Sequence, residues 1–138
     1  MSAESLRTAG IILIIYPTVV VGGVSILWLW ISRRVPYYRD NPLRQRLWAA
    51  GHAHAGVLLI LSLVALQLVD QTDLTAGWRA LVRSAFPAAA ILLPAAYFLS
   101  VLGRDAERPT PIVNLAYLGA MSLTVGMLTL GVGLLQTL

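Results

Sequence analysis

The chain has 138 residues, of which 58% are hydrophobic and only 12% are charged, and its net charge is +4. Soluble domains are typically about 45–50% apolar and about 25% charged, so this composition excludes a disordered chain and an ordinary water-soluble enzyme. The chain has no cysteine, which excludes disulfides and thiolate metal sites, and it has no basic polar segment rich in aromatic residues, so nucleic acid is not an expected partner.

Charged residues divide the chain into four long apolar stretches. A transmembrane helix needs roughly 20 mostly apolar residues, and segments such as GIILIIY and GVLLILSLVAL lack the alternation of barrel strands. The first stretch is also too long for the apolar part of a cleaved signal peptide. We therefore predict an all-α polytopic membrane protein, a four-transmembrane-helix up-down bundle that forms a single domain over 1–138, with spans at about 8–32, 46–69, 80–102 and 111–136.

Two of the predicted helices carry recognisable start signals. Asn41 is followed by Pro42, and Thr110 is followed by Pro111. In each pair a capping side chain precedes a proline at the first helical position, where proline is favoured. We expect the second and fourth long helices to begin at these prolines.

The arginines predict how the chain lies in the membrane. Seven of the ten arginines flank the first and third connections, and three lie on the side of the termini. Because basic residues of short loops stay in the cytoplasm, we expect the connections 33–42 and 103–110 to be cytoplasmic. Both termini would then lie outside the cell, with the protein integral to the cytoplasmic membrane. The basic first connection also suits anionic lipid headgroups of the bilayer.

The second predicted span contains both histidines of the chain, His52 and His54, in the segment AAGHAHAGVLLILSL. An ionisable residue inside a membrane is by default a functional candidate. Residues at i and i+2 are separated by about 200° on a helix, so the two imidazoles face different neighbourhoods. We expect His54 to face inward, with Ala50 leaving space beside it. We expect His52 to share its side with Gly56, where a second copy of the chain could approach.

A His-x-His within a membrane helix resembles the helix of haem-copper oxidase catalytic subunits in which two imidazoles serve two haems. The matching positions here are His52 and His54. The copper ligands of that family have no counterparts in this chain, so the resemblance implies haem binding without oxygen reduction. Over its full length the chain is similar to small bacterial four-helix membrane proteins with a GHAHAG-type second helix, a resemblance that implies no established activity.

Polar side chains of the other predicted helices lie at the depth of the histidines, and the residues flanking the histidines are small enough to leave room for a flat cofactor. We predict an intramembrane haem or transition-metal site with His52 and His54 as ligands. The polar residues expected around the cofactor are Ser25, Tyr97, Asn114 and Tyr117. Interhelical hydrogen bonding is the alternative explanation of the same layer.

The last predicted helix carries small residues at spacings of three and four, namely Gly119, Ser122, Gly126, Thr129 and Gly133. A face of small residues lets two helix backbones approach closely in lipid. This face predicts tight packing inside the bundle. A homodimer through Gly119, Ser122, Gly126 and Gly133 is the alternative.

The leading functional hypothesis is electron transfer or cofactor handling at the histidines. The first alternative is a non-catalytic accessory or assembly subunit of a larger membrane complex, with structural histidines. The second is a conductor of small solutes or protons, because Pro17, Pro87 and Pro94 are expected to bend their helices. No hydrolytic or phosphate-binding motif is present, so independent catalytic activity is not expected.

Overall fold

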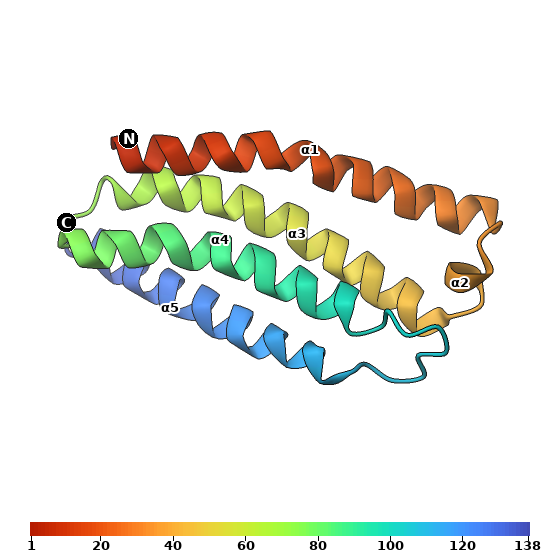
Figure 1. Cartoon of the computed structure of the whole chain (residues 1–138). Coiled ribbons are helices and arrows are strands. Elements are labelled where there is room, and N and C mark those ends of the chain that lie inside the picture. The colour runs from red at the N-terminus through yellow and green to blue at the C-terminus, as the bar shows by residue number, and fades with distance from the viewer.

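A computed structural model describes residues 1–138 and contains only helices and connections. Successive long helices run in opposite directions, and both termini lie at one end of the molecule (Figure 1). A short helix, α2 (Pro36–Arg39), lies within the first connection. These features confirm the predicted all-α four-helix bundle. The segments long and apolar enough to cross a membrane are α1 (Ala3–Ser32), α3 (Pro42–Val69), α4 (Ala76–Leu99), and η1 (Pro111–Asn114) continued by α5 (Leu115–Leu135).

The start of α3 follows its predicted signal. The Asn41 side chain accepts a hydrogen bond from the Arg44 N–H at 2.9 Å, and Pro42 occupies the first turn. The fourth span also begins at its predicted proline, but without the predicted side-chain cap. Pro111 opens one turn of 3-10 helix, and the Thr110 side chain makes no capping hydrogen bond.

The long helices are arranged in the order α1, α3, α4, α5 (Figure 1). Helix α4 has extensive interfaces with both α3 and α5, whereas α1 packs mainly on α3. One apolar core joins α1, α3 and α4, and a second lies between α3, α4 and α5 near the end that carries the termini. The first contains Ile12, Leu58, Leu59, Leu66, Ala89, Ala90 and Leu93, and the second contains Ala65, Val69, Val82, Phe86 and Leu130.

The small-residue face of α5 packs against α4 and the loop before it. A Cβ atom added to Gly119 would lie 2.8 Å from Leu93, and one added to Gly126 would lie 2.9 Å from Ala85. Between them, the Ser122 hydroxyl donates to the Ala85 carbonyl at 3.0 Å. The predicted tight packing inside the bundle is confirmed. The chain's own residues also occupy the face that a homodimer through Gly119, Ser122, Gly126 and Gly133 would need, since Gly133 lies against Leu74.

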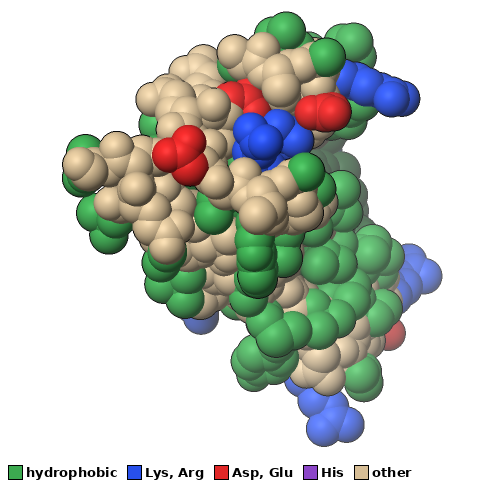
Figure 2. Space-filling model, turned by 90° about the vertical axis from the view of Figure 1, so that its left-hand side faces the viewer, with side chains coloured by type: hydrophobic (Ala, Val, Ile, Leu, Met, Phe, Trp, Pro, Cys, Tyr) green, Lys and Arg blue, Asp and Glu red, His purple; other side chains and the backbone are tan.

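The outer surfaces of the long helices are strongly apolar, and the charges gather at the ends. Helix α1 buries only Ser5 and Ile12, while Ile14 and Ile31 lie exposed on its outside. Figure 2 shows the end with both termini, where acidic and basic groups lie together above flanks of hydrophobic side chains. Apolar helices of this length suit a lipid bilayer, which would cover these flanks.

Candidate functional site

Helix α3 directs its two histidines toward different helices, as their spacing predicts. His52 lies against α1, where its Nε2 would be 2.6 Å from a Cβ atom added to Gly23. His54 lies against α4, with its ring centroid 5.1 Å from that of Tyr97. Glycine at position 23 is therefore what allows the His52 ring to approach the α1 backbone. His54 is the histidine at the extensive α3–α4 interface, and His52 is the one at the smaller α1–α3 interface.

The His54 ring is held by its own helix. Its Nδ1 lies 2.7 Å from the carbonyl oxygen of Ala50, one turn earlier. A carbonyl oxygen can only accept, so Nδ1 is the donor in this contact, and in the neutral imidazole the lone pair lies on Nε2. Nε2 makes no hydrogen bond, and the only buried unpaired side-chain nitrogen or oxygen of the chain is Trp48 Nε1. His54 Nε2 thus has no partner within the chain and is not sealed inside the protein.

The structure brings only part of the predicted polar layer to the histidines. Tyr97 packs on His54, but Tyr117 is 75% exposed and Asn114 is also exposed. Ser25 is exposed and donates to the Val21 carbonyl of its own helix. These three side chains point to the outside of the bundle because the interior faces of α1 and α5 consist of apolar and small residues.

Two smaller expectations about the histidine surroundings also change. Ala50 contributes its carbonyl to His54 in addition to the space left by its small side chain. Gly56, expected to admit a second copy, instead faces Val19 of α1 at 3.9 Å. No group of three or more His, Asp or Glu side chains is arranged to hold a metal ion. Any metal at His54 must complete its coordination with other kinds of ligand.

A second polar site, which the sequence reasoning missed, lies at the end with the termini. Asp70 at the end of α3 accepts a hydrogen bond from Arg83 of α4 at 2.8 Å. The Ser5 hydroxyl and the Ser2 N–H of α1 donate to the same carboxylate. Arg83 also donates to both serine hydroxyls and lies 3.2 Å from Glu4. We call Ser2, Glu4, Ser5, Asp70 and Arg83 the polar cluster; it joins three helices.

The polar cluster stabilises the ionised form of Asp70. Burial alone would raise the pKa of this carboxyl, but the hydrogen bonds from Arg83, Ser2 and Ser5 outweigh it and lower the pKa to about 2. The side chains of Asp70 and Arg83 are only 11% and 14% exposed. Their pairing is therefore shielded from water more than an ordinary surface ion pair.

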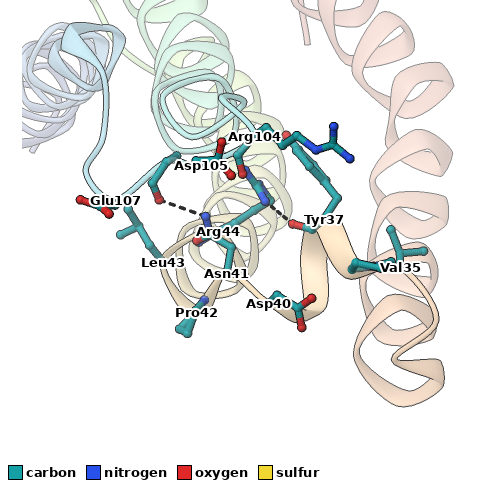
Figure 3. Close-up of a pocket in the computed structure, with 12 residues that line it drawn as sticks. Val35, Tyr37, Asp40, Asn41, Pro42, Leu43, Arg44, Arg104, Asp105 and Glu107 are labelled. Atoms are coloured by element: carbon teal, nitrogen blue, oxygen red, sulfur yellow. Dashed lines mark hydrogen bonds between the residues drawn. The ribbon is translucent and has the colours of Figure 1, made fainter.

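A third polar site fixes the opposite end of the bundle (Figure 3). Arg44, fully buried in the first turn of α3, forms no ion pair. It donates to the carbonyls of Val101 at 3.1 Å, Gly103 at 2.5 Å and Arg104 at 3.4 Å, and to that of Tyr37. The ring of Tyr37 lies 3.5 Å from the guanidinium carbon, within cation–π range.

Arg44 thus links the first connection to the third. The side chain of Asn41, which donates to the Ala106 carbonyl at 3.0 Å, and the hydroxyl of Tyr37, which donates to Leu102, add two further links. The prediction that treated this arginine as one of the loop charges available to lipid is wrong for Arg44, because the charge lies inside the protein. The other arginines of these connections, Arg33, Arg34, Arg39, Arg46, Arg104 and Arg108, are exposed.

Compared with family models, with curated proteins and with solved structures, the chain matches none. The geometry of its own residues is therefore the basis of the functional proposals below.

Proposed function

We propose that the chain is a small integral membrane protein that binds a haem iron or a transition-metal ion through His54 Nε2, for electron transfer or cofactor handling. The hydrogen bond between His54 Nδ1 and the Ala50 carbonyl carries this proposal. Histidines that bind metals commonly donate their other ring N–H to a carbonyl or carboxylate, which fixes the tautomer and the ring orientation. His54 is already held in that state.

The two histidines have different roles in this proposal. His52 is a packing residue whose ring fills the space that Gly23 leaves on α1. A metal at its Nε2 would have to displace the α1 backbone. His54 is the ligand, and Tyr97, packed on its ring, limits the rotation of the imidazole.

A haem suits this arrangement better than an ion held by protein side chains alone. A single axial histidine is sufficient to hold haem iron, whereas a closed structural metal site needs about four protein ligands. His54 lies in an apolar span, where the porphyrin would be in contact with hydrocarbon and apolar side chains. When bound, the haem would supply one-electron chemistry, and the chain would supply the His54 imidazole and the apolar surroundings.

The test is the absorption spectrum and metal content of the purified protein in detergent, before and after titration with haemin. The wild type and His52→Ala are expected to bind stoichiometric haem or metal, and His54→Ala is expected to bind none. Tyr97→Phe should keep binding, because it preserves the ring that packs on His54. The proposal is rejected if the wild type takes up neither haem nor metal, or if His54→Ala binds as well as the wild type.

We further propose that the protein lies in the cytoplasmic membrane with both termini outside the cell. The support is the seven-to-three division of the arginines between the two ends of the bundle. Basic residues in short loops resist transfer across the membrane, so the arginine-rich connections would remain in the cytoplasm.

A second candidate function, an accessory or assembly subunit of a membrane complex, is favoured by the outer side of α1. A Cβ atom added to Gly10 or Gly22 would meet nothing within 4 Å, so these glycines pack against no part of the chain. Glycines on the outside of a membrane helix allow a helix of another protein to approach closely. Replacing Gly22 with Leu should then abolish co-purification of a membrane partner while leaving the haem titration unchanged.

A further inference from the structure

A groove of about 470 Å³ lies between α1 and α3 at the end that carries the connections, away from the polar cluster. In this groove the apolar side of α1 lies next to polar side chains of α2 and α3. Its lining comes from three elements: Gly23, Ile26, Leu27 and Trp30 of α1, Tyr38 of α2, and Gln45, Arg46 and Ala49 of α3.

Tyr38 contributes an unpaired hydroxyl to this groove. The residue is only 2% exposed, and its ring packs 5.7 Å from that of Trp48. The hydroxyl makes no hydrogen bond within the chain. Trp48 Nε1 is the only side-chain nitrogen or oxygen that is both fully buried and without a partner, so the Tyr38 hydroxyl is not fully buried. The small exposed part of Tyr38 therefore includes the phenol oxygen. Burial raises the pKa of Tyr38, so this oxygen keeps its proton and can donate a hydrogen bond.

Arg46 contributes a positive charge that the protein does not neutralise. The ion pairs of the chain involve Arg39 and Arg83, and Arg46 takes part in none of them. Its neighbour Gln45 uses its amide N–H groups on the carbonyls of Tyr38 and Arg39. The guanidinium of Arg46 is thus the charged donor in the lining of the groove, and an anion is its natural complement.

The remaining lining suits a hydrocarbon chain. Gly23, Ile26 and Leu27 of α1 and Ala49 of α3 make up the apolar part of the lining. Trp30 lies at the rim and is 64% exposed, as expected of a tryptophan at the boundary between hydrocarbon and headgroups. The polar lining groups thus lie toward the end of the spans, and the apolar ones lie further along them.

We propose that this groove binds one anionic phospholipid of the surrounding leaflet. The phosphate accepts hydrogen bonds from the guanidinium of Arg46 and the hydroxyl of Tyr38, and an acyl chain lies along Ile26 and Leu27. The unpaired charge of Arg46 selects a headgroup with net negative charge over a zwitterionic one. The site is independent of the proposed haem ligand His54, which lies on the other side of α3.

The test measures lipid retention by native mass spectrometry and binding by titration of detergent-purified protein with phosphatidylglycerol or phosphatidylcholine. Phosphatidylglycerol should bind the wild type more tightly than phosphatidylcholine. Arg46→Gln should weaken phosphatidylglycerol binding by about fivefold, which corresponds to one basic residue near a charged membrane surface. Tyr38→Phe should also weaken it, and Ala49→Trp should prevent it by filling the groove without changing any charge.

Arg108→Gln is the matched control, because Arg108 is an exposed arginine at the same end of the bundle and lines no part of this groove. It should leave phosphatidylglycerol binding unchanged. Equal weakening by Arg108→Gln and Arg46→Gln would overturn the proposal in favour of a general charge effect. Equal binding of the two lipids by the wild type, or full binding by the Ala49→Trp variant, would also overturn it. Circular dichroism of each variant checks that the helices are retained.

Discussion

The Asp70 carboxylate and the Arg83 guanidinium lie 2.8 Å apart across the turn between α3 and α4. Each also binds the start of α1, through Ser2 and Ser5. One ion pair thus fixes the relative positions of three membrane-length helices. Removing either partner would leave the other charge poorly solvated, which is costly at a site this enclosed.

Replacing Asp70 with Asn should lower stability while preserving the shape of the side chain. The variant loses the charge-assisted hydrogen bond from Arg83, and we expect a loss of about 1–3 kcal/mol. Asp73→Asn makes the same charge change at an exposed residue of the same connection and should have little effect. Thermal unfolding in detergent, followed by loss of helical circular dichroism, measures both. Equal effects of the two substitutions would contradict the role of the polar cluster.

The same ion pair should make stability depend on pH in the acid range. The pKa of Asp70 is lowered from its ordinary value of 3.8 to about 2 in the folded protein. Its contribution is therefore fully present above about pH 4 and is lost as the pH falls toward 2. We expect a loss of about 1 kcal/mol over this range, since water partly screens a pair at the end of the bundle. This step in the unfolding temperature should be missing in Asp70→Asn.

Replacing Gly126 with Leu should separate α5 from α4. A Cβ atom at this position would lie 2.9 Å from Ala85, and a leucine side chain would overlap with Phe86 as well. Such overpacking destabilises by about 1–3 kcal/mol. Gly131→Leu is the control on the same helix, because nothing lies within 4 Å of a Cβ added there. A Gly126→Leu protein as stable as Gly131→Leu would contradict the described α4–α5 interface.

Replacing Arg44 with Met should destabilise the end of the bundle that carries the connections. Methionine keeps much of the side-chain volume but leaves the carbonyls of Val101 and Gly103 without their donor. An unpaired buried group costs about 1–3 kcal/mol, and the bond to Val101 is the buried one, so we expect a loss of about 1–3 kcal/mol. Arg108→Met removes an exposed arginine and should change stability by less than about 0.5 kcal/mol. Limited proteolysis of 100–110 should accelerate only in Arg44→Met.

The proposed orientation can be tested with single cysteines, because the chain has none of its own. In intact cells, a membrane-impermeant thiol reagent should label Thr137→Cys near the end of the chain and should not label Glu107→Cys in the third connection. Neither substitution alters the arginine count on which the orientation rests. Permeabilised cells should label both positions. The reverse pattern in intact cells would invert the orientation and leave the four-helix fold unaffected.

The spans could be predicted because charges and apolar residues are segregated along the chain. The helices themselves do not end where the predicted spans end. Helix α1 begins at Ala3 and not near residue 8, because Ser2 caps it and Glu4 pairs with Arg83. Helix α4 ends at Leu99 and not near residue 102, and the following carbonyls of Val101 and Gly103 turn toward Arg44. In both cases a contact with a residue distant in sequence lies at the helix end, where the local pattern gives no signal for it.

The same limit explains what was found and missed at the candidate sites. The opposite directions of His52 and His54 follow from helix periodicity alone, and so were predictable. The sequence around Asp70 and Arg83 does not predict their pairing. It shows only that both residues lie near the same end of two neighbouring antiparallel spans. The outward positions of Asn114 and Tyr117 depend on which face of α5 meets α4. The position of these residues along their helices could be predicted, but the direction of their side chains could not.

The polar cluster also has a consequence for the order in which the protein assembles in the membrane. Its members come from the first three long helices, and α5 contributes none. During synthesis, Ser2 and Ser5 are made first, and their partners follow only later, Asp70 at the end of α3 and Arg83 in α4. The start of α1 is therefore held by two residues made much later, and the polar cluster can be completed only after the third long helix has inserted.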